Sequence, residues 1–389
     1  MLKARVPRAG TGISPARAGA GLTLGVEEEF LLVDPVSGTP VPYAGRVLAA
    51  AGEHPFDGGR YHRELLKSQV EAATGVCDSL DGARGQIRDA RARLAAATAR
   101  EGFLLLSTGT PVLPGPVPVS DHEERYAAIS RMYAGIVADY QACGCHVHVG
   151  VGGRETAVAV CNHLRPWLPA LLALSANSPF DHGRDSGHAS WRMIEQSRFP
   201  GSGVPPAFAS AADHDRAVDL LVDCGVVADP AMSFWLARPS PHLPTVEVRA
   251  ADAAATADDA VLQAAITRAL VRTALDDLSA GREAPDSGPD VCAAAVWTAA
   301  RYGLEGPAIH PFEERQVPVR RLLGDLMFHI TPALEETGDL AEVRALLTWV
   351  MRTGSGASRQ RQAASDGGLR ALVRMLARQT AATPERGGR

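Results

Sequence analysis

Three short segments that lie far apart in the chain each place polar side chains at every second residue. They are GVEEEF (25–30), CHVHVG (145–150) and TVEVR (245–249). In a β-strand, residues i and i+2 lie on the same face. We therefore expect a sheet with one apolar face and one face of carboxylates, imidazoles and a guanidinium.

The alternation assigns each residue of these segments to a face. The residues expected on the polar face are Glu27, Glu29, His146, His148, Thr245, Glu247 and Arg249. The valines between them, together with Val26 and Phe30, are expected to point into the core. Hard divalent cations that hold phosphates, Mg²⁺ or Mn²⁺, are the simplest explanation for a face so rich in oxygen ligands.

The segment YHRELLKSQVEAATG (61–75) adds further candidates. Lys67, Gln69 and Glu71 share one face if this stretch is extended, whereas Glu64 has the opposite parity and joins them only if the chain bends. Less specific interpretations stay open for every motif: solvated acids on an edge strand, half-buried histidines, or cross-strand ion pairs.

A zinc site competes with magnesium because Cys143 and Cys145 precede the two histidines. Cys145 has the parity of the core-facing valines, so it cannot join His146 and His148 on one tetrahedral ion in an unbroken strand. Six irregularly spaced cysteines in 389 residues do not suggest a disulfide framework, and we expect a reducing cytoplasm.

Composition excludes several classes of protein. The formal net charge of −5 and the lack of a basic stripe argue against nucleic acid as a partner. No apolar run approaches the roughly 18–20 residues that cross a bilayer, so no membrane partner is expected. We expect residues 1–21 to form a disordered basic tail and residues 22–385 to form a single domain. Neither a phosphate-binding G-x-x-x-x-G-K-[ST] loop nor a G-x-S-x-G elbow occurs.

The hydrophobic pattern predicts a mixed α and β chain with a helical C-terminal third. A long Gly-, Pro- and Ser-rich stretch at 177–210 is predicted to be a loop and a candidate lid. The main predicted elements are strands at 22–34, 103–108, 234–240 and 245–252, and helices at 78–102, 122–142, 155–175, 258–280, 290–302, 318–335, 340–353 and 367–381.

Longer motifs extend these segments along nearly the whole chain. They are GVEEEF, ELLKSQVEAATGVC (64–77), GCHVHVGV (144–151), LPALLALSANSPF (168–180), GHASWR (187–192), RPS-x4-TVEVRAAD (238–252), AARYGL (299–304) and GSGASRQR (354–361). In this order, from about residue 22 to residue 380, they resemble the carboxylate–amine ligases of the glutamate–cysteine ligase type 2 family.

The resemblance implies a glutamine-synthetase-like α+β fold, whose curved and mainly antiparallel sheet forms a polar funnel for ATP, metals and an amino acid. It implies that ATP phosphorylates the carboxylate of glutamate or another amino acid, and that an amine then displaces phosphate to give an amide. Related enzymes often self-associate, so we allow for a homo-oligomer.

The resemblance also implies roles for individual residues. The implied metal ligands are Glu27, Glu29, Glu64, Glu71, His146 and Glu247. Arg249 is expected to meet the transferred phosphoryl group, and Arg192 and Arg238 to hold the carboxylate or phosphate. His148 is expected to line the nucleotide or substrate pocket, and Lys67 and Arg249 are expected to contact the nucleotide.

The sequence departs from the family pattern at three places. The family usually has His where this chain has Pro111, and Asn and Arg where it has Ala295 and Thr298. These losses make a specialised biosynthetic substrate a hypothesis beside glutamate and cysteine. Two other classes stay open: a metal-dependent amide hydrolase that uses the His-x-His pair, and a nucleotide-binding member without turnover.

Overall fold

The computed structural model describes residues 21–115, 118–119 and 124–381. Residues 1–20 of the predicted tail lie outside this part. Gly21 is described, and its amide donates to the carbonyl of Gly150 at 2.7 Å.

The predicted strands and helices occur in the expected order, with further short elements between them. The strands are β1 (Leu24–Val33), β2 (Arg60–Arg63), β3 (Gln69–Ala73), β4 (Leu104–Leu106), β5 (Gly144–Gly150), β6 (Phe180–Asp181), β7 (Arg184–Asp185), β8 (Ala237–Pro239), β9 (Thr245–Asp252), β10 (Pro307–His310) and β11 (Arg315–Pro318). The α-helices are α1 (Ala44–Ala51), α2 (Leu80–Arg100), α3 (Glu124–Tyr133), α4 (Gly135–Ala138), α5 (Arg154–Leu164), α6 (Leu168–Ser175), α7 (Trp191–Gln196), α8 (Ala211–Asp223), α9 (Ala257–Ser279), α10 (Pro289–Tyr302), α11 (Val319–Thr337), α12 (Leu340–Thr353) and α13 (Gly356–Ala381).

The main sheet is antiparallel and joins the three polar segments. Its strand order is β2-β3-β1-β5-β9-β8, and β4 pairs with the far end of β1. The register places Glu27 opposite His146, and Glu29 opposite Glu71. Along β1, β3 and β5 this register gives two chemically different faces. Between β5 and β9 the register shifts at Cys145/Val147, and this shift places Asp252 opposite Gly144.

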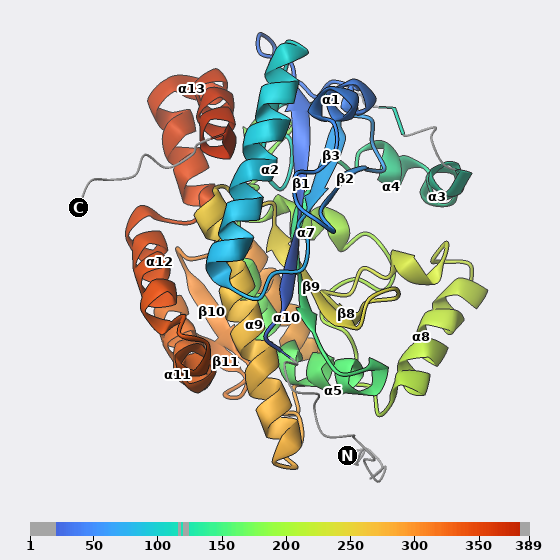
Figure 1. Cartoon of the computed structure of the whole chain (residues 1–389), viewed down its shortest axis with the longest axis vertical. Helices are drawn as coiled ribbons and strands as arrows, with labels where there is room; N and C mark the ends of the chain where they lie inside the picture. The colour runs from blue at the N-terminus through green and yellow to red at the C-terminus, as the bar shows by residue number, and fades with distance from the viewer. Residues whose placement is uncertain (1–20, 116–117, 120–123, 382–389) are drawn as a thin grey trace.

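The apolar face of the sheet carries the core. Val26, Val147 and Val248 are buried there, and Cys145 lies among them, as its parity predicts. Helices α2 and α9 cross this face in front of β1 (Figure 1). Ser79 caps α2 by accepting from the amide of Gly82, and a Thr256–Asp259 capping box begins α9.

The middle acid of GVEEEF belongs to the apolar face. Glu28 is 2% exposed and accepts from Arg91 of α2 at 2.9 and 2.6 Å, in a two-point pair. Arg91 also donates to the carbonyl of Ala254 at 2.7 Å, which ties α2 to the segment after β9. A buried charge is tolerated where its partner and hydrogen bonds replace water.

Several local predictions are wrong. The stretch 177–210, predicted as one long loop, contains the β6–β7 hairpin and α7. Residues 177–180, 189–190 and 192–193 of this stretch are buried, and its role as a lid stays a prediction. Residues 356–366, which lie between the helices predicted at 340–353 and 367–381, form the first part of α13, which is interrupted at Gly368. The β10–β11 hairpin was not predicted at all.

The most apolar helical stretch lies inside the fold. Arg154–Ser175 is long and apolar enough to cross a membrane, but 89% of its most apolar window is buried within the protein, as in a core helix. The helix predicted at 155–175 is interrupted at Pro166 and Pro169, where a short 3₁₀ turn (Arg165–Trp167) separates α5 from α6.

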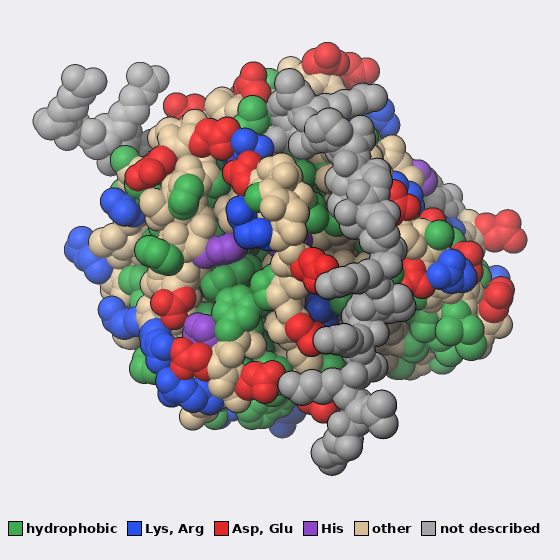
Figure 2. Space-filling view, turned by 90° about the horizontal axis from the view of Figure 1, so that it is seen from below, with side chains coloured by type: hydrophobic (Ala, Val, Ile, Leu, Met, Phe, Trp, Pro, Cys, Tyr) green, Lys and Arg blue, Asp and Glu red, His purple; other side chains and the backbone are tan. Residues whose placement is uncertain are grey.

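Surface charges of both signs are mixed over the face seen from below. In Figure 2, acidic and basic side chains of the described residues are interspersed, with small basic groups near one edge. The described residues of this face therefore form no extended basic track of the kind that follows a nucleic-acid backbone.

We predict that Glu28→Gln lowers the free energy of unfolding by about 3–5 kcal/mol, because it leaves the Arg91 charge buried without its counter-ion. Denaturant unfolding measures this loss. The matched surface change Glu336→Gln, in the exposed pair with Arg272, should cost less than about 1 kcal/mol. Equal effects of the two variants would contradict a structural role for the buried pair.

Candidate active site

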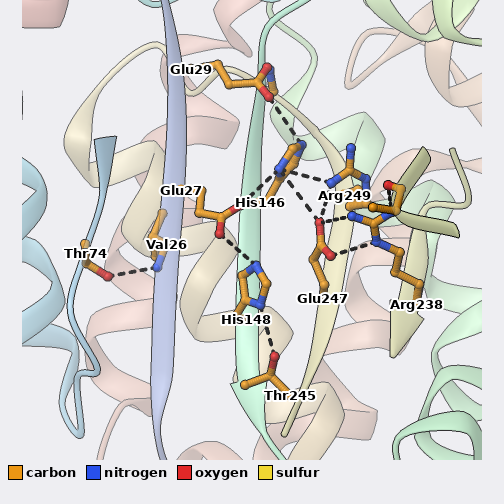
Figure 3. A network of polar contacts seen from close by, with 12 residues as sticks. Val26, Glu27, Glu29, Thr74, His146, His148, Arg238, Thr245, Glu247 and Arg249 are labelled. Atoms are coloured by element: carbon orange, nitrogen blue, oxygen red, sulfur yellow. Dashed lines mark hydrogen bonds and ion pairs between the residues drawn. The ribbon is translucent and has the colours of Figure 1, made fainter. Parts of the chain in front are cut away.

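The polar face of the sheet gathers side chains from β1, β3, β5 and β9 into one network. Figure 3 shows Glu27 and Glu29 facing the histidines of β5, with Glu247 and Arg249 of β9 beyond them and Arg238 of β8 at the edge. The carboxylates fall into two groups that could each hold a metal ion.

The first group consists of three carboxylates, Glu29, Glu64 and Glu71, which we call the triglutamate cluster. One oxygen from each lies within 4.8 Å of the others. Glu64 reaches the cluster because residues 60–73 fold into a β2–β3 hairpin, which supplies the bend that its parity required. Glu29 comes from β1, directly opposite Glu71.

Like charges and burial dominate the electrostatics of this cluster. Burial, reinforced by the charge of Glu29, raises the pKa of Glu64 to about 8. Burial and the neighbouring Glu64 raise the pKa of Glu71 well above its usual range. Burial also raises the pKa of Glu29, although Arg192 acts in the opposite direction. Three carboxyl groups that resist ionising together are a site where a divalent cation would replace protons.

The second group, Glu27, His148 and Glu247, we call the His148 cluster. The Nδ1 atom of His148 lies 3.0 Å from the Thr245 hydroxyl, and its Nε2 lies 3.2 Å from an oxygen of Glu27. A hydroxyl that holds one ring nitrogen of a histidine orients the other nitrogen towards a ligand position.

The second group is compensated by positive charge. Arg238 donates to both oxygens of Glu247 at 2.7 and 3.2 Å, and Arg249 forms a further short contact with the same carboxylate. Although burial acts to raise the pKa of Glu247, Arg249 and Arg238 hold it well below its usual range. Burial also acts to raise the pKa of Glu27. Hydrogen bonds to His146 and His148 outweigh this effect and hold the pKa below its usual range.

His146 lies between the two clusters. Its ring nitrogens are 3.5 Å from Glu27, 3.9 Å from Glu29 and 4.0 Å from Glu247. Burial and the adjacent Arg249 lower its pKa to about 4, so the ring is neutral at physiological pH. His148, which was expected to line a pocket, thus lies with two acids in a possible metal site. His146, which was expected to be a metal ligand, lies within about 4 Å of acids from both clusters.

Arg192 approaches the same face from α7. Its guanidinium lies against Gly144, where a Cβ atom would come within 2.5 Å of Arg192 Nη2 and 2.9 Å of His146 Nε2. Glycine therefore leaves the space in which these two groups meet. The Gly144 amide also donates to Glu29 at 2.5 Å, which fixes that carboxylate beside them.

The remaining residues singled out from the sequence, Lys67, Ala295, Thr298 and Cys143, belong to neither cluster. Lys67 precedes β3, and its amide donates to the carbonyl of Pro118. Ala295 and Thr298 are buried in α10, which packs on α6 and β10, so neither belongs to the two clusters. Cys143 lies 3.3 Å from the Gln69 amide and belongs to neither cluster, which leaves no support for the zinc alternative among the described residues.

A cavity that the sequence did not predict opens beside the triglutamate cluster. Its volume is about 480 Å³, and its lining residues are Leu48, Tyr61, His62, Arg63, Glu64, Glu71 and Tyr126. Glu64 and Glu71 of the cluster line this cavity, so a small molecule bound in it would lie beside the cluster. Only the pairing of β2 with β3 brings the tyrosine, histidine and arginine of β2 to this place.

We predict that metal-free protein loses stability as pH rises from 6 to 8.5. A carboxyl group whose pKa is raised by folding binds more protons in the folded state, so its contribution is complete below the unfolded value of 4.5. That contribution disappears as pH rises through about 8 for Glu64. Mn²⁺ replaces these protons, so it should raise the melting temperature more at pH 8.5 than at pH 6.

Thermal melts in EDTA and in Mn²⁺ check this prediction. Glu195, whose pKa burial raises to about 8, acts in the same direction but lies outside the cluster. The double variant Glu64→Gln/Glu71→Gln therefore serves as the control, and it should remove most of the pH-dependent Mn²⁺ shift. An unchanged shift in that variant would mean that the ion binds elsewhere.

Comparison with known proteins gives the family. A family model described as glutamate-cysteine ligase family 2 matches residues 23–375. A putative glutamate–cysteine ligase 2-2 of Saccharopolyspora erythraea is 55% identical over 363 residues, which cover 93% of each chain. A putative glutamate–cysteine ligase 2-1 of Nocardia farcinica is 46% identical and covers 87% of this chain and 88% of its own length.

Solved structures give the fold. A glutamate–cysteine ligase of Francisella tularensis in complex with AMP aligns with a TM-score of 0.69 at 14% identity, covering 93% of this chain and 89% of its own. A bifunctional glutathione synthetase of Pasteurella multocida aligns with a TM-score of 0.64 at 15% identity, covering 92% of this chain and 51% of its own. These likenesses confirm the predicted glutamine-synthetase-like fold, and the family match over nearly the whole sequence establishes that the chain belongs to glutamate–cysteine ligase family 2.

Proposed function

We propose that this protein is an ATP-dependent carboxylate–amine ligase that uses glutamate as the carboxylate substrate and cysteine as the amine. One observation supports the proposal most strongly: two carboxylate clusters and three arginines share one face of the sheet. The names of its relatives suggest the two amino acids. The same face could serve another acid and amine in a specialised pathway, so the substrates need a direct test.

The chemistry of the reaction explains this set of residues. A carboxylate is a poor acyl donor because its oxygen leaves badly, and phosphorylation converts that oxygen into a good leaving group. Mg²⁺ or Mn²⁺ held by the two clusters would neutralise the phosphates of ATP during the transfer. The carboxylates fit such ions, since the triglutamate cluster has three oxygen donors and the raised pKa values of an uncompensated site.

The arginines supply the fixed positive charge. Arg249 lies between Glu247 and His146, where it would stabilise negative charge on a transferred phosphoryl group. Arg238 holds Glu247 and is anchored by the carbonyls of Ala231 and Ser233, so its donors are already oriented. Arg192 reaches the face from the opposite side of His146 and would hold the substrate carboxylate or a phosphate.

We predict that Glu247→Gln lowers kcat by at least about 100-fold, because the change removes a ligand charge that transition-state stabilisation needs. The side-chain volume is nearly unchanged, so circular dichroism should report an intact fold. Glu336→Gln, which removes one carboxylate from a surface pair, should keep the parental rate. Parental activity in Glu247→Gln would show that the metal assignment is wrong.

A phosphate-release screen of amino acids against amines, with ATP and Mg²⁺, tests the function itself. Ligase activity requires that ADP and phosphate appear only when both an acid and an amine are present. A hydrolase would release an amine from an amide without ATP, and a non-catalytic member would bind ATP without turnover. Efficient turnover of glutamate with cysteine would count against a specialised substrate.

Two further expectations stay predictions. The low cysteine content and the proposed reaction favour a cytoplasmic location, and related enzymes favour self-association. Fractionation of cells and light scattering of the purified protein would test them.

A further inference from the structure

Arg192 is held differently from the other two arginines of the site. Its side chain is 3% exposed, yet Nη1 makes no hydrogen bond with any described residue. Within the described part of the chain, its Nη2 donates only to the carbonyl of Arg249, at 3.3 Å. A guanidinium donor that is buried without an acceptor costs free energy. Other contacts around Arg192 must therefore offset this cost and hold the side chain in place.

Those contacts converge on Asp252, the last residue of β9. Asp252 is fully buried, and one of its oxygens accepts from the Asn177 amide at 2.8 Å and from the Ser178 hydroxyl at 2.7 Å. The other oxygen accepts from the Ser190 hydroxyl at 2.8 Å. The same oxygen lies 3.8 Å from Arg192 Nη1, too far for a hydrogen bond but close enough for attraction.

The two serines connect Asp252 to the backbone of Arg192. The Ser178 hydroxyl, which donates to Asp252, accepts from the Arg192 amide at 3.1 Å. Ser190 is the N-cap of α7 and accepts from the Met193 amide at 3.2 Å. The Asp252 carboxylate therefore holds two serines in place. Ser178 binds the backbone amide of Arg192, and Ser190 caps α7, the helix that carries the Arg192 side chain.

We propose that Asp252 is a positioning residue that holds the Arg192 guanidinium against Gly144, where its Nη2 side meets the anionic substrate group. The inference rests on the proposed function for the identity of that anion. Asp252 itself touches no substrate, because Arg192, Ser178 and Ser190 surround it. Its β9 neighbours Glu247 and Arg249 face the site directly, so a single strand would carry both reacting and supporting residues.

The C-terminal motif GSGASRQR supports the same unit from outside. Gln360 is 1% exposed and donates to both oxygens of Asn177, each at 2.8 Å. A Cβ atom at Gly356 would come within 2.1 Å of the Asn177 side-chain oxygen, so glycine allows this close approach. Arg361 forms a two-point pair with Asp185 at 2.8 Å, which holds the β6–β7 hairpin. Helix α13 thus braces the segment that leads from Asn177 to Arg192.

The test compares Asp252→Asn with Asp339→Asn, which alters another buried carboxylate paired with an arginine, Arg268, away from the site. Both variants should melt at lower temperature than the parent. Only Asp252→Asn should weaken binding of L-glutamate or inorganic phosphate by at least tenfold in calorimetry, while the affinity for ATP changes less than threefold. Equal anion affinity in the two variants would overturn the proposal.

A second pair of variants, which perturbs the structure less, tests the proposal if Asp252→Asn fails to fold. Ser178→Ala removes the hydroxyl between Asp252 and the Arg192 amide, whereas Ser175→Ala removes a buried hydroxyl that bonds only within α6. Ser178→Ala should weaken anion binding about three- to tenfold and Ser175→Ala should not. A parent protein that binds neither anion would also overturn the proposal. Anion binding without turnover would count only against the proposed function.

Discussion

Repulsion among carboxylates on one face of a sheet is the constraint on which this structure depends. Glu29, Glu64 and Glu71 bring their oxygens within 4.8 Å of one another, where all three cannot keep their charges without a counter-ion. The sheet tolerates the arrangement because its other face buries an extensive core against α2, α6 and α9. Core packing thus maintains an arrangement of acids that would otherwise be unfavourable.

The two clusters solve the charge problem in different ways. In the His148 cluster, Arg238 and Arg249 already neutralise Glu247, so these acids stay ionised without any added ion. In the triglutamate cluster, no arginine pairs with Glu64 or Glu71 among the described residues, and burial with like charge raises the pKa of both acids. A site that would exchange protons for a cation therefore lies beside one whose arginines would bind an anion. Both properties are needed to bring a triphosphate and a carboxylate together.

Alternation along strands was enough to predict the polar face, because parity depends only on local backbone geometry. It correctly separated Cys145 from the histidines and placed Glu247 with Arg249. It could not predict which histidine faces which acid, since that depends on the pairing of β1, β5 and β9. Glu64 likewise needed the β2–β3 hairpin, which no local pattern specified.

Residues that act through buried contacts were harder to find. Glu28 lies in the same acidic run as Glu27, and only Arg91 of α2 reveals its structural role. Asp252 has the parity opposite to Glu247 and would be assigned to the core on pattern alone. The segment around Ser178 and Ser190 resembles a loop in composition, yet remote contacts from β9, α10 and α13 order it. Such contacts are long-range, so they emerge only with the tertiary structure.

The most direct test of the central claim is the number of Mn²⁺ ions bound per chain, measured by electron paramagnetic resonance titration at pH 8. The structure predicts two ions in the parent protein. Glu71→Gln should lose the ion of the triglutamate cluster, and Glu247→Gln should lose the other. A parent chain that binds no Mn²⁺, or variants that keep both ions, would contradict the claim that these distant acids form metal sites.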